Sequence, residues 1–553
     1  MPLKTIIVPV DGASNIKLEV FDFETLESVY SQGAATPVRQ VDNLAYNATG
    51  EEFAWFDATI RSLPEKMKNC AVIAPAARGA SGGLVGYDNT LVEAPGEGLT
   101  LSYTQRYPDA VEDRFCELAG SAEEFFLETG SIRDFPGSLT LIKRLLFEEM
   151  ERPELLKKTA GFGTYGALMS GHFIGENYLY AVKKAGNEHS YWMCHSGARN
   201  IRERPGAPSS LAVKLSSFSR LIPRETAVVY RPLAFMPSGQ AAVFGLSCPV
   251  TVIPGGHDTS LSHIPVISTF YQSFPEAAGN SVIQVEAGTW TMIARIGGFD
   301  KLASTGSASG RALSLSKCDK LSLPADGWRR DLLVQGTVDG EPVVTARYGG
   351  GNDFRHMKKL TESRGKIFSI GAGFDKLSQP WERLLLRMAE AADCFVLPNI
   401  SPVNHGTGPF PELKGRIINE EFLFGVHGAS YLATTLTTAL TAAIQVEAIS
   451  AERSAPLVIT AGGAKDPLYG KLLATFTGHT VYALSDRNGN PVTETTALGA
   501  AIAGKAALME IHPYQVDTAG FDIKYRQVNP FTGDSAQKLY RYREKWTSQM
   551  EVK

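Results

Sequence analysis

Four small-residue turns carry the side chains that could do chemistry, and each turn follows a short apolar run. The turns are Asp11-Gly12-Ala13-Ser14, Gly255-Gly256-His257-Asp258, Gly288-Thr289 and Ala461-Gly462-Gly463-Ala464. Turns without large side chains let backbone N–H groups approach a phosphate closely. Phosphoryl transfer needs such donors, a carboxylate that holds hydrated Mg²⁺, and a base beside the acceptor hydroxyl. The order of the four turns therefore favours phosphoryl transfer.

Two carboxylates in these turns suit the remaining roles. Asp258 is the best candidate for the general base, and Asp11, followed by backbone donors, is the candidate for positioning a metal ion. Each has a structural alternative, because Asp258 could cap a helix that starts at Thr259 and Asp11 could simply form a turn.

The elements that must position these turns alternate between strands and helices. We expect a hairpin from Ile6–Val10 and Ile16–Asp22, because β-branched and alternating residues flank a tight turn. The spacing of apolar and capping residues predicts further elements, namely strands at 70–75, 250–254, 282–287, 456–460 and 480–484, helices at 53–63, 430–449 and 496–503, two helices flanking a break near 136–137, a helix opened by Asp466-Pro467, and a charged tail helix after Pro513. This alternation is typical of an α/β fold.

Composition narrows the function classes. The 553 residues carry 54 Lys+Arg against 58 Asp+Glu, a net charge of −4, and 44% are hydrophobic. A near-neutral chain without a basic block offers no footprint for nucleic acid or for an anionic membrane, and disorder is excluded. The six cysteines include no C-x-x-C pair, and the N-terminus lacks a long apolar stretch, so we expect reduced thiols and a cytoplasmic location.

Several segments resemble the FGGY family of carbohydrate kinases, in the actin-like ATPase superfamily. The segment 460–468, Thr-Ala-Gly-Gly-Ala-Lys-Asp-Pro-Leu, and the helix that begins near Glu494 are similar to the family's adenosine-binding signature and its companion helix. Gly256-His257-Asp258-Thr259 resembles the catalytic-aspartate motif, and 286–291, with its Gly-Thr-Trp, resembles the phosphate loop of the rhamnulose and fuculose kinases. The segment 138–149 resembles the N-domain helix signature, whereas Lys17 stands near where the family usually has Arg.

The resemblance implies a fold of two ribonuclease-H-like domains flanking a central cleft. The expected limits are 1–262 for the N-terminal domain, 263–512 for the ATP-binding C-terminal domain and 513–553 for a tail. It also implies ATP and Mg²⁺, with Asp258 as base and Asp11 as the metal-positioning residue. The residues expected to bind ATP are Gly12, Ala13, Ser14, Gly288, Thr289, Ala461, Gly462, Gly463 and Ala464.

The sugar is the least determined part of this prediction. The expected substrate contacts are Arg78, Ser81, Gln105, Arg106, His257 and Asp258. The Gly-Thr-Trp loop favours L-fuculose or L-rhamnulose, phosphorylated at the 1-position, over ribulose, xylulose, glycerol or erythritol. An acyl-phosphate kinase or phosphatase of the same superfamily and a catalytically silent sugar or nucleotide sensor stay open. The expected partners are a small sugar and ATP, without nucleic acid or membrane, and a homodimer is the state common among relatives.

Overall fold

A computed structural model describes most of the chain. The described residues are 3–93, 98–135, 137, 140–185, 196–202, 206–223, 227–247, 249–274, 277, 281–296, 323, 326–368, 379–450, 453–518 and 523–550. Ser138 and Leu139 of the helix signature, and three of the cysteines, Cys194, Cys248 and Cys318, lie outside the described residues.

An N-terminal sheet is built around the predicted hairpin. Strands β1 (Lys4–Asp11) and β2 (Asn15–Asp22) pair in antiparallel register, with Asp11 opposite Ile16. The other strands of this sheet are β3 (Ser28–Ala35), β6 (Asn69–Ile73), β7 (Ala76–Ala77), β11 (Ala234–Phe235), β12 (Thr251–Val252) and β13 (Gly256–His257). Side chains alternate across β1, so that Ile7 packs into one core, which includes α1 (Thr49–Arg61), and Ile6 and Val8 pack into another.

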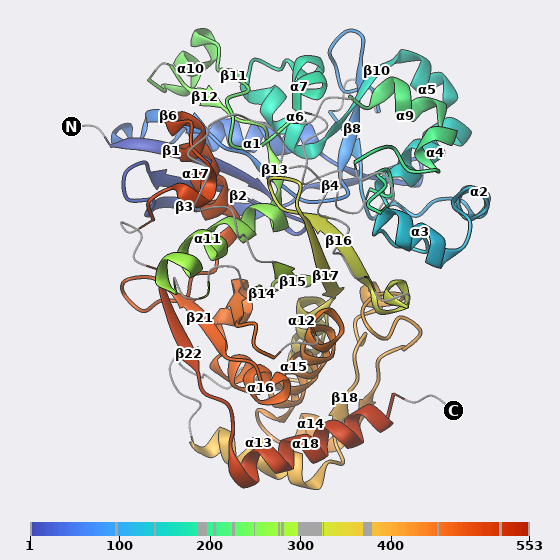
Figure 1. Cartoon of the computed structure of the whole chain (residues 1–553), viewed down its shortest axis with the longest axis vertical. Coiled ribbons are helices and arrows are strands. Elements are labelled where there is room, and N and C mark those ends of the chain that lie inside the picture. The colour runs from blue at the N-terminus through green and yellow to red at the C-terminus, as the bar shows by residue number, and fades with distance from the viewer. Residues whose placement is uncertain are drawn as a thin grey trace.

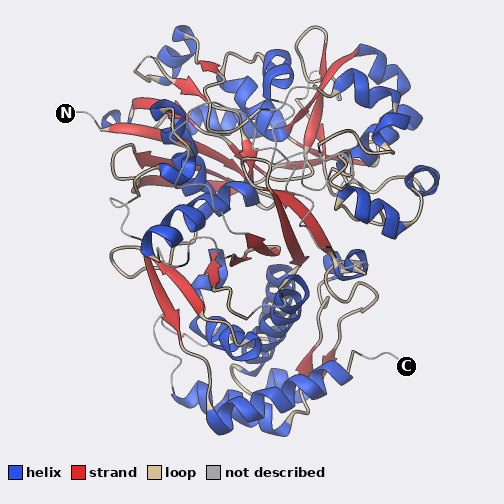
Figure 2. Cartoon of the chain, viewed as in Figure 1, coloured by secondary structure: helices blue, strands red, loops and turns tan. Residues whose placement is uncertain are grey.

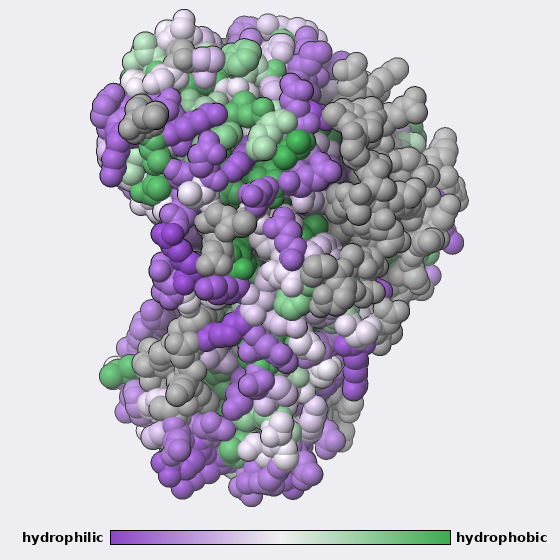
Figure 3. Space-filling model, turned by 60° about the vertical axis from the view of Figure 1, so that its left-hand side comes forward, coloured by the Kyte–Doolittle hydropathy of each residue, from purple (hydrophilic) through white to green (hydrophobic). Residues whose placement is uncertain are grey.

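A second, seven-stranded sheet forms the C-terminal lobe, below the first in Figures 1 and 2. Its order is β16 (Leu332–Gly336), β17 (Pro342–Tyr348), β15 (Thr291–Ile296), β14 (Val282–Ala287), β20 (Leu457–Thr460), β21 (Val481–Ser485) and β22 (Lys524–Val528). One face is covered by α12 (Gly350–Ser363), α15 (Ala429–Ile449), α16 (Pro467–Thr477) and α18 (Gly533–Ser548). In space-filling form the molecule narrows between the two lobes (Figure 3).

Two helices lie between the two sheets. Helices α11 (Asp258–Ser273) and α17 (Thr495–Met509) pack against each other, and their side chains share one core with Ile6 and Val8 of β1 and with Val458 of β20. Figure 1 shows α17, late in the sequence, beside β1 and β6 of the N-terminal sheet. The helix pair therefore connects the two lobes through a common apolar layer.

The hairpin β16–β17 makes a second connection. It belongs to the C-terminal sheet, but Leu333 packs against Ile132 and Phe135 of the N-terminal lobe. The carbonyl of Gly336 accepts a hydrogen bond from Oγ of Ser260 at 2.6 Å. The β16–β17 hairpin thus contacts the N-terminal lobe through Leu333 and the start of α11 through Gly336.

Most predicted elements are present, and two differ. The turn after β20 is a 3₁₀ helix, η8 (Ala461–Lys465), in which Ala461 adopts φ +57°. The expected tail helix exists as α18, but the sequence reasoning missed β22, which pairs with β21 at the sheet edge. Tyr542 and Trp546 of α18 are fully buried, so this segment packs as part of the C-terminal lobe. The domain limits 1–262, 263–512 and 513–553 stay a prediction.

Helix α15 is the one described helix long and apolar enough to cross a membrane by length and composition. Of its most apolar 18-residue window, 83% is buried inside the protein. It packs against α16, α12 and strand β17, as the sequence predicts for a core helix.

Candidate functional site

Three strand ends of the N-terminal sheet bring the predicted chemistry together. Strands β1, β7 and β13 run parallel, with Asp11 opposite Ala77 and Ala77 opposite His257. Because the carboxyl ends of parallel strands lie at one edge, the residues that end or follow them, Asp11, Arg78 and Asp258, are neighbours. Residues 247 positions apart thus meet through strand pairing alone.

The C-terminal sheet contributes in the same way. Strands β14 and β20 are parallel, with Glu286 opposite Thr460, so the Gly288-Thr289 turn and η8 lie side by side. A Cβ at Gly463 would meet Cβ of Ala287 at 2.5 Å. The approach of these two turns therefore requires glycine at this position.

A cavity of about 230 Å³ opens between the turns of both sheets. Six of the predicted site residues line it, namely Ala13, Arg78, His257, Asp258, Gly288 and Thr289. The remaining lining residues are Gly79, Ala80, Tyr103, Thr259, Glu286, Trp290, Met292 and Arg347. Ala13 of the first turn, the candidate base Asp258 and the Gly288-Thr289 turn therefore face one space.

Asp258 occupies the first turn of α11, and its side chain is 33% exposed. The backbone N–H of Thr259 donates to Oδ1 of Asp258 at 2.7 Å, and Nε2 of His257 lies 3.2 Å from the same oxygen. Burial lowers the pKa of His257, although the charge of Asp258 opposes this, so the imidazole is neutral near pH 7. A helix N-terminus complements the negative charge, and the carboxylate remains open to a ligand in the cavity.

Arg78 holds two buried carboxylates. Its Nη2 lies 2.8 Å from Oδ1 of Asp11 and 3.1 Å from Oε1 of Glu52, and all three side chains are at most 4% exposed. Tyr165 donates its hydroxyl hydrogen to Oε2 of Glu52. Burial raises the pKa of Asp11 and of Glu52, against the opposing effect of Arg78. The charge of Arg78 is thus already compensated inside the protein.

Asp11, the predicted metal-positioning residue, is fully buried and does not line the cavity, so its role in holding a metal ion stays a prediction. Its Oδ2 is buried and accepts no hydrogen bond from the described residues. The described residues contain no group of three or more His, Cys, Asp or Glu side chains that could form a metal cage. A single free carboxylate oxygen fits an ion such as Mg²⁺, which keeps several waters and takes its other ligands from substrate phosphates.

Glu286 is the carboxyl group that the sequence reasoning quoted in a motif but gave no role. Burial, and next the charge of Asp258, raise its pKa to about 8, while the Ser262 hydroxyl donates to Oε2 at 2.8 Å and opposes the shift. Glu286 is therefore mostly protonated near pH 7, and this wall of the cavity carries little negative charge.

Arg347 is the second cation of the cavity, and it was missed as well. Its Nη2 lies 3.3 Å from Oδ1 of Asp331, and both residues are almost fully buried. The guanidinium carbon lies 4.2 Å from the ring centre of Phe135 and 4.8 Å from that of Trp290. Cation–π contacts thus hold a Trp ring at the cavity wall between the lobes.

Three predicted substrate residues do not line this cavity. The Gln105 amide is used by the backbone, since Oε1 accepts the N–H of Ala45 at 2.6 Å and Nε2 donates to the carbonyl of Arg106. Arg106 is exposed, and Ser81 is buried with a hydroxyl that has no hydrogen-bond partner among the described residues. Their roles as sugar contacts stay a prediction.

Not all of the predicted nucleotide residues line the cavity either. Gly12, Ser14 and the four residues Ala461 to Ala464 are absent from its wall. Gly12 shapes the first turn, because a Cβ there would meet the carbonyl oxygen of Asn15 at 2.7 Å. The exposed Gly462 leaves η8 accessible beside the second turn. Their roles in binding ATP stay a prediction.

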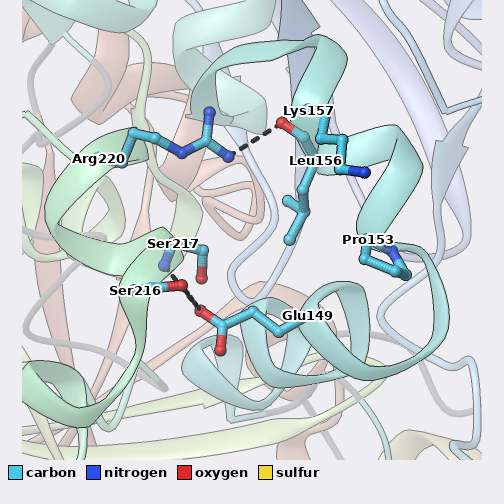
Figure 4. Close-up of a pocket in the computed structure, with 7 residues that line it drawn as sticks. All are labelled: Glu149, Pro153, Leu156, Lys157, Ser216, Ser217 and Arg220. Carbon is cyan, nitrogen blue, oxygen red and sulfur yellow. Dashed lines mark hydrogen bonds between the residues drawn. The ribbon is translucent and has the colours of Figure 1, made fainter.

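A larger hollow, of about 530 Å³, lies on the N-terminal lobe away from these turns (Figure 4). Glu149 accepts the backbone N–H of Ser217 at 2.7 Å, and Arg220 donates to the carbonyls of Thr159 and Leu156. Its charged groups thus hold together α4 (Leu141–Glu151), α5 (Pro153–Lys158) and α9 (Ser216–Leu221). They are used for packing.

Comparison with known proteins gives one family match and several shared folds. Residues 317–510 match the C-terminal domain of the FGGY carbohydrate kinases. None of the curated proteins compared with the chain matches it.

Solved structures of carbohydrate kinases share the fold along the whole chain. A carbohydrate kinase from Novosphingobium aromaticivorans is similar with a TM-score of 0.70 and 20% identity, over 100% of this chain and 99% of that one. A xylulose kinase from Lactobacillus acidophilus is similar with a TM-score of 0.72 and 13% identity, over 99% of this chain and 98% of that one. A gluconate kinase from the same organism is similar with a TM-score of 0.69 and 13% identity, over 99% of this chain and 97% of that one.

These neighbours show the expected fold, a two-domain α/β fold of the actin-like ATPase type. The family match of the C-terminal part and the fold shared by the whole chain together support the FGGY carbohydrate kinase family, and with it a phosphotransferase.

Proposed function

We propose that the protein transfers the γ-phosphate of ATP to a primary hydroxyl of an uncharged sugar, with Asp258 as general base. The observation that carries this proposal is the position of Asp258, partly exposed and facing the cavity into which Ala13 of the first turn and Gly288 and Thr289 of the second also project. A base, phosphate donors from two lobes and room for a small acceptor are the parts that such a transfer needs.

The reaction uses each part once. Asp258 takes the proton of the acceptor hydroxyl, whose oxygen forms a bond to the γ-phosphorus while the bond to the β-phosphate bridging oxygen breaks and ADP leaves. The Gly288 and Thr289 backbone and the Thr289 hydroxyl stabilise the transferring group. Asp11 would be the residue that positions Mg²⁺, and the ion would supply positive charge to the phosphates. Gly462 and Gly463 of η8 leave space for the adenosine.

The charges of the cavity favour a neutral acceptor. Both lining arginines have carboxylate partners, Arg78 with Asp11 and Glu52 and Arg347 with Asp331. Neither is therefore available to bind an acid such as the gluconate named for one structural neighbour. Within neutral sugars we retain L-fuculose and L-rhamnulose, phosphorylated at the 1-position, as the first candidates because of the Gly-Thr-Trp turn. Xylulose, named for another neighbour, is the alternative. We also propose a cytoplasmic enzyme, with Cys70, Cys116 and Cys394 as free thiols.

ADP release across a panel of deoxyketoses, ketopentoses and polyols tests the substrate. We expect the largest kcat/KM for a 6-deoxyketose. No ADP release above background with any 6-deoxyketose would exclude that class of sugar as the substrate.

Asp258→Asn tests the base. The variant keeps the hydrogen bond from Thr259 but cannot take a proton, so turnover should fall by a factor on the order of 10² to 10⁴ while ATP binding persists. The exposed Asp113→Asn is the matched control. Turnover within a few-fold of the parent protein would show that another group is the base.

A further inference from the structure

The start of helix α12 lies directly on the second phosphate turn. A Cβ at Gly351 would meet the carbonyl oxygen of Gly288 at 2.2 Å and Cα of Thr289 at 3.0 Å, so only glycine allows this approach. One helical turn further on, Nη1 of Arg355 donates to Oγ1 of Thr289 at 3.3 Å. The Arg355 side chain is therefore held at the turn that we assign to the transferring phosphate.

A hydrogen-bonded chain fixes the direction of this side chain. Nη2 of Arg355 donates to Oδ1 of Asn352 at 2.7 Å, and Nδ2 of Asn352 donates to Oδ1 of Asn404 at 3.0 Å. Asn404 is fully buried and donates in turn to Asp353 at 2.7 Å and to the carbonyl of Gly349 at 2.8 Å. The exposed guanidinium thus rests on a rigid base, which lowers the entropy cost of holding it in place.

The charge of Arg355 is not compensated by a carboxylate. Among the described residues no carboxylate forms an ion pair with Arg355, and the side chains to which it donates, Thr289 and Asn352, are both neutral. Three other cations, Arg78, Arg347 and Lys17, differ in this respect because each has an acidic partner, and that of Lys17 is Glu494 at 2.8 Å. An exposed cation on neutral partners beside a phosphate turn is suited to an incoming anion.

We propose that Arg355 binds the γ-phosphate of ATP and stabilises the charge that develops on it during transfer. The inference rests on the proposed function and adds a catalytic residue to it. The planar guanidinium offers two N–H groups toward the non-bridging oxygens, while the Thr289 hydroxyl and backbone bind the same group from the turn. Arg355 takes no part in proton transfer, since Asp258 accepts the acceptor proton.

Three variants test this role. Arg355→Ala removes the charge, Arg355→Lys keeps the charge without the planar fork, and Lys359→Ala removes an exposed cation one helical turn further along α12 as the matched control. Each is measured for kcat with the best acceptor and, without acceptor, for the dissociation constants of ADP and of a non-hydrolysable ATP analogue by calorimetry.

We expect Arg355→Ala to lower kcat by a factor on the order of 10² to 10³, the loss usual for one transition-state donor. Its affinity for the ATP analogue should fall by about tenfold or more, while the affinity for ADP changes less than about threefold. The kcat and the analogue affinity of Arg355→Lys should lie between those of the parent protein and of Arg355→Ala. Both values should be unchanged in Lys359→Ala.

Three outcomes would overturn the inference. An unchanged kcat in Arg355→Ala excludes a catalytic role, and equal losses of ADP and analogue binding exclude the γ-phosphate as the contact. An equal effect of Lys359→Ala would show only the general field of the helix. If the parent protein binds neither nucleotide, the proposed function itself fails, which separates that result from a failure of Arg355 alone.

Discussion

Glu286 is a carboxyl group that the cavity keeps protonated near neutral pH. Burial raises its pKa to about 8, with Asp258 as the next contribution. A protonated Glu286 does not repel the phosphates that we place at Gly288 and Thr289, two and three residues further along. The substitution Glu286→Gln copies this neutral state and retains an acceptor for the Ser262 hydroxyl.

The pH dependence of stability follows from the direction of this shift. Folding raises the pKa of Glu286. Between about pH 4.5 and 8 this group therefore holds its proton in the native state and has lost it in the unfolded state. The free energy of unfolding of the parent protein therefore falls as the pH rises through this window, by up to about 1.4 kcal/mol per pH unit from this one group. The value is an upper bound, because Glu286 is only partly buried and solvent screens part of the effect.

Thermal unfolding of the two proteins between about pH 5 and 7.5 measures this contribution. The Tm of Glu286→Gln should rise relative to that of the parent protein as the pH increases, by up to roughly 6 °C over the window for a cooperative unit of about 250 residues. Exposed Glu151→Gln is the control and should show a constant difference. A Tm difference that stays constant for Glu286→Gln as well would refute the protonated carboxyl.

Two further substitutions test buried contacts, one inside each lobe. Arg78→Met leaves Asp11 and Glu52 buried without their cation, so the free energy of unfolding measured in denaturant should fall by about 3 to 5 kcal/mol. The control is Arg114→Met, which removes one member of an exposed ion pair and should lower it by less than about 1 kcal/mol. Similar losses for both variants would contradict the buried network. Trp546→Ala removes a fully buried ring whose Nε1 donates to the carbonyl of Val396 at 3.1 Å. By the same measurement we expect the free energy of unfolding to fall by about 3 to 5 kcal/mol. A fall below about 0.5 kcal/mol would show that α18 is a dispensable tail.

The fold was predictable where local rules decide the element. The β1–β2 hairpin has its turn residues in sequence, and Asp466 caps α16 through the N–H groups of Leu468 and Tyr469 as the Asp-Pro pair predicts. Strand β22 was missed because Lys524-Tyr525-Arg526-Gln527-Val528 is a charged edge strand without an apolar run. Charges protect an exposed edge and at the same time hide it from a search for apolar periodicity.

The site was predictable for backbone turns and much less so for distant side-chain partners. Asp258 and Thr289 sit in turns with a recognisable order, and both line the cavity. Glu52 gave no signal, since it lies within a helix beside the exposed Glu51 and is buried only because Arg78 and Tyr165 arrive from other elements. Arg355 was invisible for the same reason, because its role depends on the approach of α12 to a turn some 60 residues earlier.

The placement of α17 bears on how the chain is made. Ile6 and Val8 of β1 are covered partly by α17, whose Gly504 lies against Val72 and Ala74 of the same lobe. At about 5 to 20 residues per second, the ribosome completes α17 about 25 to 100 s after β1 emerges. During that interval one apolar face of the first sheet lacks the part of its cover that α17 provides. The N-terminal half therefore cannot complete its native core during synthesis, and we expect nascent chains that stop before residue 495 to depend on chaperones.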